Sequence, residues 1–127
     1  MTTICLKNKT IVVTGAAGFI GSNLALELLR TQTLLTIIGI DNMNDYYDTS
    51  IKEWRLSEIQ KCAEKHPDST WTFIKGNIAD KSLIDSIFRD YNPDIVVNLA
   101  AQAGVRYSIT NPDRIVYTNI FSACFYY

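Results

Sequence analysis

The hydrophobic and polar positions of this chain divide it into short apolar runs and longer stretches with helical spacing. Short apolar runs rich in β-branched residues predict strands, because these side chains pack well on a pleated sheet. The second run is apolar almost throughout, which is typical of a strand in a parallel sheet that is covered on both faces. The predicted strands are Thr10–Val13, Leu34–Ile40, Trp71–Ile74 and Ile95–Leu99.

Four further stretches carry apolar residues every three or four positions, as amphipathic helices do. The first helix is predicted to pack one face made of Ile20, Leu24, Ala25, Leu28 and Leu29. The second is expected to end near residue 64 and to bury Ile51, Leu56, Ile59 and Ala63. Its N-cap is expected at Asp48, Thr49 or Ser50, since such side chains accept a hydrogen bond from a free N–H group.

The third predicted helix begins after an N-cap at Asp80 and carries an apolar stripe made of Leu83, Ile84, Ile87 and Phe88. The fourth is expected to begin at Pro112, because proline after an N-cap asparagine suits the first helical position. Strands and helices therefore alternate along the whole chain, which predicts an α/β fold. The expected architecture is a doubly wound parallel sheet of Rossmann type, with about four strands in the order 3-2-1-4.

The last helix ends in bare aromatic residues, with no glycine cap and no following strand. We therefore expect residues 1–127 to form a truncated, partial domain of Rossmann type. A missing fifth strand would leave an open edge on the fourth, and this edge is expected to favour a homodimer or other self-association.

The turn after the first strand contains glycines with the spacing Gly-x-x-Gly-x-x-Gly. This differs from the commoner Gly-x-Gly-x-x-Gly, whose first glycine would fall at Ala16. Glycine lets bare backbone approach a pyrophosphate, whose charge is then stabilised at the helix N-terminus. The hypothesis is a dinucleotide phosphate site at Gly15, Ala17, Gly18, Phe19, Ile20 and Gly21. The alternative is a turn with a structural role alone.

An acidic residue, Asp41, ends the second predicted strand 20 residues beyond Gly21, and Asn42 follows it. This is the usual offset of the residue that binds the ribose hydroxyls of a dinucleotide. A carboxylate there would repel a 2′-phosphate, so NAD is favoured over NADP. The alternative is a loop carboxylate that caps a local group. The nearest bases, Lys52 and Arg55, form no evident phosphate clamp in the sequence.

Polar and small residues follow the third and fourth strands, at the edge of the sheet where ligands bind. Asn77 and Ile78 are candidates for an adenine contact, with an ordinary turn as the alternative. Small side chains after the fourth strand would let a cofactor lie close to the backbone, although packing explains them as well; these are Ala100, Ala101 and Ala103. Leu99, which ends that strand, is a further candidate cofactor contact. Arg106 and Ser108 come next, and an arginine there suits a substrate phosphate or carboxylate. A solvated surface arginine is the alternative.

Composition excludes several classes of function. With 12 basic and 13 acidic residues, the formal net charge of −1 gives no electrostatic basis for nucleic-acid binding. No apolar run approaches the roughly 20 residues of a membrane span, and the N-terminus lacks a signal-peptide pattern. Three dispersed cysteines and one histidine predict no metal site and a reducing compartment. A cytoplasmic protein is expected.

The stretch Thr14–Gly21 resembles the signature of the extended short-chain dehydrogenase/reductase family of nucleotide-sugar epimerases and dehydratases. Two further stretches, Asp41–Asp48 and Ala100–Ile109, resemble its UDP-glucuronate 4-epimerase branch. The resemblance covers essentially the whole chain but only the N-terminal part of a family member. It implies NAD contacts at the three glycines, Asp41 and the alanines named above. Asn77 departs from the acid that the family places at the adenine, and Asn119 matches a family asparagine.

The resemblance also implies chemistry by a Tyr-x-x-x-Lys pair, in which tyrosine is the general base and lysine lowers its pKa. In such enzymes the sugar is oxidised at C4 by NAD, and the hydride returns to the other face. No Tyr-x-x-x-Lys occurs in these 127 residues, so no catalytic residue is assigned and the chain itself is expected to be inactive.

The resulting hypothesis is the NAD-binding part of a nucleotide-sugar 4-epimerase, acting on UDP-glucuronate when whole. In the intact enzyme the partner would be a nucleotide-sugar substrate. The alternatives are a fragment of a UDP-glucose 4-epimerase or of a sugar-nucleotide 4,6-dehydratase, or a non-catalytic NAD-binding module.

Overall fold

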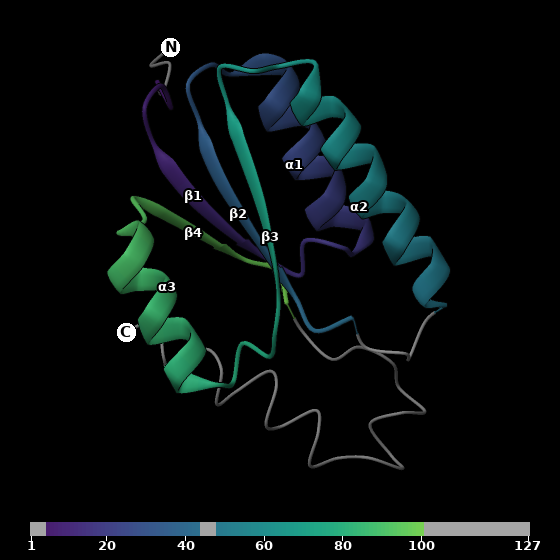
Figure 1. Cartoon of the computed structure of the whole chain (residues 1–127), viewed down its shortest axis with the longest axis vertical. Helices are drawn as coiled ribbons and strands as arrows, with labels where there is room; N and C mark the ends of the chain where they lie inside the picture. Colours follow the sequence, from purple (N-terminus) through teal and green to yellow (C-terminus); the bar gives the residue numbers. More distant parts are fainter. Residues whose placement is uncertain (1–4, 44–47, 101–127) are drawn as a thin grey trace.

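Four parallel strands form one sheet in the order β3-β2-β1-β4. The strands of this computed structural model are β1 (Thr10–Thr14), β2 (Thr36–Asp41), β3 (Thr70–Lys75) and β4 (Ile95–Asn98). The structure describes residues 5–43 and 48–100 (Figure 1). The predictions for Ala101, Ala103, Arg106, Ser108, Asn119 and the helix from Pro112 lie outside these residues. The predicted fold class and strand order are confirmed.

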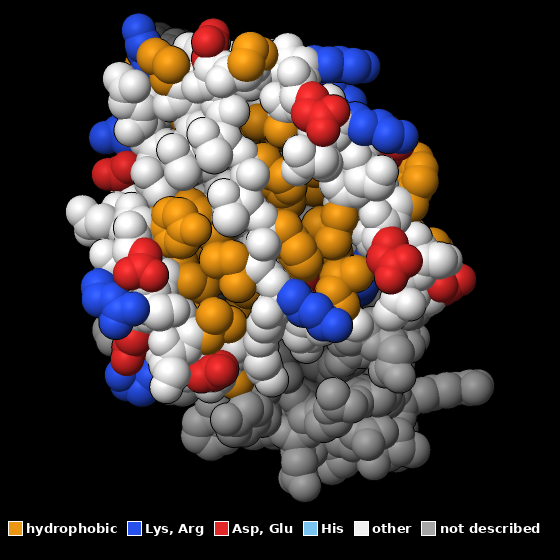
Figure 2. Space-filling view, viewed as in Figure 1, with side chains coloured by type: hydrophobic (Ala, Val, Ile, Leu, Met, Phe, Trp, Pro, Cys, Tyr) orange, Lys and Arg blue, Asp and Glu red, His pale blue; other side chains and the backbone are white. Residues whose placement is uncertain are grey.

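Within the described residues, three helices cover the two faces of the sheet (Figure 1). They are α1 (Phe19–Thr31), α2 (Thr49–Glu64) and α3 (Lys81–Tyr91). Alternate residues of β1 point to opposite faces, so Ile11 and Val13 pack in the cluster with α1 and α2, whereas Val12 packs with α3. On the face shown in Figure 2, hydrophobic side chains gather in the middle and charged ones lie along the sides.

Local hydrogen bonds fix where the helices begin. Asp48 is the N-cap of α2 and accepts from the Ser50 N–H at 2.9 Å, which selects one of the three predicted caps. Hydrogen bonds from Ser50 lower the pKa of the Asp48 carboxyl below its usual value. Asp80 caps α3 as predicted, accepting from the Leu83 N–H at 3.3 Å. The capping signals in the sequence therefore placed both helix starts.

β1 and β4 are also joined at the start of their pairing by residues far apart in the chain. The Thr10 N–H donates to Asp94 Oδ2 at 2.8 Å, and the Asp94 N–H donates to the Thr10 oxygen at 2.9 Å. This pair sets the register in which Ile11 lies opposite Ile95.

Three predictions of burial or strand extent are wrong in detail. Leu34 lies before β2, is exposed and has a φ of +56°, because the chain turns there and its oxygen accepts from the Asn8 N–H. Ile20 is 66% exposed, since α1 packs on the sheet through smaller residues centred on Gly21 and Ala25. Ile51 is 47% exposed, because the buried residues of α2, Ile59 and Cys62, lie in its C-terminal half.

The remaining predicted core residues of these helices are at least partly buried. Ala25, Leu29 and Ile59 are fully buried. Leu24, Leu28, Leu56 and Ala63 are partly buried and pack against the same cluster. On α3 the predicted stripe is confirmed, with Ile84 and Ile87 in the core and Leu83 and Phe88 packed beside them.

Gly39 in β2 allows a tryptophan ring to cover the strand, which yields a test of the packing. A Cβ at this position would lie 2.2 Å from the Trp71 ring atom Cη2 and 2.8 Å from the Ala16 Cβ. We expect Gly39→Ala to lower the free energy of unfolding by about 1–3 kcal/mol, because the added methyl overpacks the site. Urea denaturation of the chain measures this change.

The control is a double-mutant cycle with Trp71→Leu, which removes the ring. If the ring causes the strain, Gly39→Ala costs less in the Trp71→Leu background than in the wild type. Strictly additive losses would contradict this explanation.

Candidate functional site

The glycine turn lies where the sheet changes direction. It follows β1, which lies between β2 and β4, and the chain crosses to one face after β1 and to the other after β3. In doubly wound sheets this switch point, beyond the carboxyl ends of the strands, is where ligands bind. The residues that end β1, β2 and β4 are Thr14, Asp41 and Asn98, and all three are polar.

The glycines of the turn are required by close backbone contacts. Gly15 has a φ of +69°, which residues with a Cβ rarely adopt, and a Cβ there would lie 3.0 Å from the Leu99 oxygen and the Ala100 nitrogen. A Cβ at Gly21 would lie 2.2 Å from the Gly15 oxygen. At Gly18 the same oxygen would be 3.1 Å away. The glycine turn is therefore packed directly against the N-terminal end of α1.

The N-terminus of α1 has no side-chain cap. Gly18 is the N-cap, with extended backbone, and no side chain accepts a hydrogen bond at this helix end. In the described part of the chain, the Ser22 N–H is the first of the helix with a backbone partner, the Gly18 oxygen at 3.0 Å. Phe19 and Ile20, which begin the helix, are both exposed. Their N–H groups lie at the positive end of the helix dipole, where an anion is stabilised.

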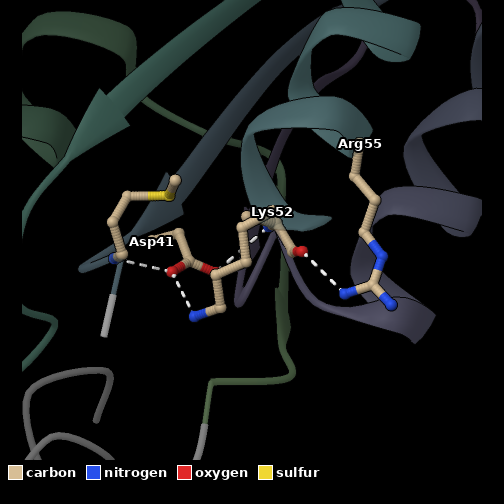
Figure 3. A network of polar contacts seen from close by, with 5 residues as sticks. Asp41, Lys52 and Arg55 are labelled. Atoms are coloured by element: carbon tan, nitrogen blue, oxygen red, sulfur yellow. Dashed lines mark hydrogen bonds and ion pairs between the residues drawn. The ribbon is translucent and has the colours of Figure 1, made fainter. Parts of the chain in front are cut away.

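The carboxylate of Asp41 is buried behind the glycine turn and accepts from three groups (Figure 3). Oδ2 accepts from the Ala17 N–H at 3.1 Å. Oδ1 accepts from the Met43 N–H at 2.8 Å and from Lys52 Nζ at 3.1 Å. Asp41 therefore holds a local backbone group, as the alternative interpretation of the sequence stated. Its predicted role at a ribose stays a prediction. Among the bonds from described residues, one lone-pair position of Oδ2 is not used.

Two basic residues from the start of α2 reach the turn, and the sequence alone did not place them there. Lys52 pairs with Asp41, and Arg55 Nη1 donates to the Ala17 oxygen at 3.3 Å (Figure 3). The Arg55 guanidinium also lies 5.9 Å from the centroid of the Phe19 ring, at the distance of a cation–π contact. The sequence contained one signal for this arrangement: Lys52 and Arg55 are three residues apart on the predicted helix after Asp41, so they lie on the same side of that helix.

The end of β4 is fixed to β1 by a threonine that the sequence analysis did not assign. Thr14 Oγ1 donates to Asn98 Oδ1 at 2.6 Å and accepts from the Ala100 N–H at 3.0 Å. Leu99 and Ala100, two of the predicted cofactor residues, are thereby held against Gly15. The signal in the sequence that could have identified Thr14 and Asn98 is that each is a polar residue at the end of an apolar run.

The predicted adenine contact has a different local setting. Asn77 Oδ1 accepts from the Ala79 N–H at 2.9 Å, which is the hydrogen bond of a turn asparagine. Ile78 is buried in the cluster that includes Ile84 and Ile87 of α3. An adenine contact at Asn77 and Ile78 stays a prediction. Asn42 is half-buried directly after β2, beside Asp41.

Residues 5–43 and 48–100 contain neither a metal-binding cluster nor a membrane-spanning helix. No three His, Cys, Asp or Glu side chains there are grouped so that they could hold a metal ion. Within the same ranges, every helix is too short or too polar to cross a bilayer.

The fold and the glycine turn define a Rossmann-type α/β domain. Residues 12–124 match the family model described as GDP-mannose 4,6 dehydratase. The match covers most of the chain, so the chain belongs to this family. The finding also confirms the resemblance to nucleotide-sugar epimerases and dehydratases that the sequence motifs indicated.

Individual relatives agree with this assignment. The chain is 46% identical to "Protein CapI" of Staphylococcus aureus over 110 residues, which are 87% of this chain and 30% of that protein. It is 40% identical to UDP-glucuronate 4-epimerase 4 of Arabidopsis thaliana, over 87% of this chain and 23% of the relative. The chain therefore spans about a third or less of the length of these relatives.

Among solved structures, the UDP-glucose 4-epimerase of Bifidobacterium longum, in complex with NAD+ and UDP, superposes with a TM-score of 0.71. The two sequences are 25% identical, and the match covers 91% of this chain and 31% of the other. This likeness agrees with the Rossmann-type fold described here.

The hydroxyl of Thr14 provides a test of how the site is held together. Thr14→Val keeps the shape of the side chain but leaves the Ala100 N–H and Asn98 Oδ1 without this partner. We expect the free energy of unfolding to fall by about 1–3 kcal/mol, as measured by urea denaturation.

Thr14→Ser is the matched control, because it keeps the hydroxyl and removes only a methyl group. Its loss of stability should be smaller than that of Thr14→Val. The opposite ranking would show that packing of the methyl, and not the hydroxyl bridge, holds β4 to β1.

Proposed function

We propose that this chain is the NAD-binding part of a nucleotide-sugar 4-epimerase whose substrate is UDP-glucuronate. The observation that carries the proposal is the uncapped N-terminus of α1, packed against a glycine turn with the Asp41 carboxylate beside it. The similarity to UDP-glucuronate 4-epimerase 4 supports the sugar, and the NAD+-bound relative supports the cofactor.

The donor groups present fit a dinucleotide. The N–H groups of Phe19 and Ile20, two exposed residues at the uncapped start of α1, would donate to the pyrophosphate at the positive end of the helix dipole. The unused acceptor position of Asp41 Oδ2 would accept from a ribose hydroxyl. Ala100, held close to Gly15 by Thr14, would border the cofactor without a bulky side chain. Bound NAD would supply a hydride acceptor for C4 of the sugar.

Residues 1–127 contain no Tyr-x-x-x-Lys, so in this proposal the chain binds the cofactor and the proton-transfer groups lie elsewhere. Arg106 and Ser108 are the candidates in this chain for contact with the substrate. Residence in the cytoplasm and self-association through the edge of β4 that faces away from β1 are further parts of the proposal. Among the described residues, β4 pairs only with β1.

A second candidate is a UDP-glucose 4-epimerase or a 4,6-dehydratase. The description of the matching family model favours a dehydratase, and the Bifidobacterium longum structure favours a UDP-glucose 4-epimerase. A third candidate is an NAD-binding module without catalysis. The coding sequence after Tyr127 discriminates these classes, since a Tyr-x-x-x-Lys there supports an enzyme and a stop codon supports the module.

Cofactor binding can be tested at one backbone donor. Phe19→Pro removes the first N–H group of α1, and proline suits this position because Gly18 before it is extended. Phe19→Ala is the matched control, since it removes the same ring and keeps the N–H. We expect NAD to bind the wild type more weakly than micromolar, because residues 1–127 contain no Tyr-x-x-x-Lys, whose lysine would hold the ribose.

Relative to Phe19→Ala, Phe19→Pro should weaken NAD binding about tenfold, the effect of one charge-assisted hydrogen bond. Calorimetry measures the affinity, and amide chemical shifts at Gly18 and Ile20 locate the ligand. Equal affinities of the two variants would contradict a pyrophosphate at this helix end. Micromolar or tighter binding by the wild type would contradict the expected weakness.

Catalysis gives a separate test. The chain incubated with NAD and UDP-glucuronate should give no 4-epimer by NMR of the anomeric proton, because the tyrosine–lysine pair is absent. Turnover above the no-protein control would show that other residues of this chain perform the proton transfer.

A further inference from the structure

We propose that Lys52 is a selectivity residue of the ribose pocket: it neutralises Asp41, so that the site discriminates less against a 2′-phosphate than an unpaired carboxylate would. The inference rests on the proposed function, namely that a nicotinamide dinucleotide binds at the glycine turn. A carboxylate without a partner favours NAD, because it repels the 2′-phosphate of NADP. The pairing with Lys52 therefore changes the cofactor preference expected from Asp41 alone.

The pair is shielded from solvent. Lys52 Nζ lies 3.1 Å from Asp41 Oδ1, and the two side chains are 13% and 5% exposed. At this separation and burial, the positive charge is screened little by water or salt. A ligand phosphate that approaches Asp41 would therefore meet a pair with almost no net charge.

The hydrogen bonds of Asp41 restrict how it could hold a ribose. A carboxylate offers about four lone-pair positions. Three are occupied, by Ala17 N–H on Oδ2 and by Met43 N–H and Lys52 on Oδ1. The bonds from the described residues leave one position, so Asp41 cannot give each ribose hydroxyl a lone pair of its own while these bonds remain. A second group is needed to contact the ribose.

Lys52 has the donors for that contact. Its ammonium carries three N–H donors, of which Asp41 uses one. The other two can donate to a 2′-hydroxyl oxygen or, with greater effect, to a 2′-phosphate. Arg55, one helical turn further on α2, is bound to the Ala17 oxygen and adds a second positive charge at the turn (Figure 3).

A purely structural pair is the competing explanation, in which Lys52 only fastens α2 to the end of β2. The two explanations differ in what they predict for ligands. A structural pair affects stability and the binding of both cofactors equally, whereas a selectivity residue changes the ratio of the two affinities.

The test is titration of the chain with ADP-ribose and with 2′-phospho-ADP-ribose, followed by calorimetry. Lys52→Met removes the charge and keeps the aliphatic stem, and Lys52→Arg keeps the charge. Lys81→Met is the control, since Lys81 pairs with Asp85 on the solvent-exposed side of α3. We expect Lys52→Met to lower the affinity for the 2′-phosphate ligand at least tenfold more than for ADP-ribose. Lys52→Arg and Lys81→Met should leave the ratio within about twofold of the wild type.

Asp41→Asn provides the opposite change, because it removes the negative charge that pairs with the Lys52 ammonium. We expect this variant to shift the ratio of the two affinities toward 2′-phospho-ADP-ribose. This variant keeps the proposal testable if Lys52→Met fails to fold. An unchanged ratio in Lys52→Met, or in Asp41→Asn, overturns the role of Lys52 while ADP-ribose still binds. Failure of the wild type to bind either ligand overturns the proposed function, and the selectivity proposal with it.

Discussion

The buried carboxylate of Asp41 is the interaction on which the rest of the site depends. It joins the glycine turn through Ala17, the chain after β2 through Met43, and α2 through Lys52. Removing one partner of a buried ion pair is costly, typically about 3–5 kcal/mol, because the other charge is left uncompensated. The turn is therefore positioned by an electrostatic contact from outside it, and its glycines alone do not fix its place relative to β2.

The glycines and the helix end carry different kinds of information. Gly15 and Gly21 are required by backbone packing, so any Rossmann turn of this shape would need them, with or without a ligand. The uncapped start of α1 is a separate observation, because soluble helices commonly satisfy these N–H groups with a side chain. The hypothesis that a ligand binds here rests on the uncapped start of α1. The glycines allow the backbone to approach that ligand.

Much of the fold could be predicted because it follows from local patterns. The alternation of apolar runs and amphipathic stretches specified the strand order, and the caps at Asp48 and Asp80 specified two helix starts. The pairings of Lys52 with Asp41 and of Thr14 with Asn98 could not be predicted, because they depend on how separate elements meet. The exposure of Ile20 was missed for a related reason. Periodicity gives the apolar side of a helix, but the approach of α1 to the turn at Gly21 decides which residues are covered.

The pairing of β4 with β1 has a consequence for how the site forms. Thr10 bonds to Asp94, and Thr14 bonds to Asn98 and to the Ala100 N–H, in each case across at least 84 residues of chain. During synthesis the glycine turn and α1 leave the ribosome long before β4 exists. Closing so large a loop is slow relative to helix formation, and chains rich in such distant contacts fold slowly. The nascent chain would thus pass through a period in which β1 is an unprotected edge, and completion of the site coincides with closure of the sheet.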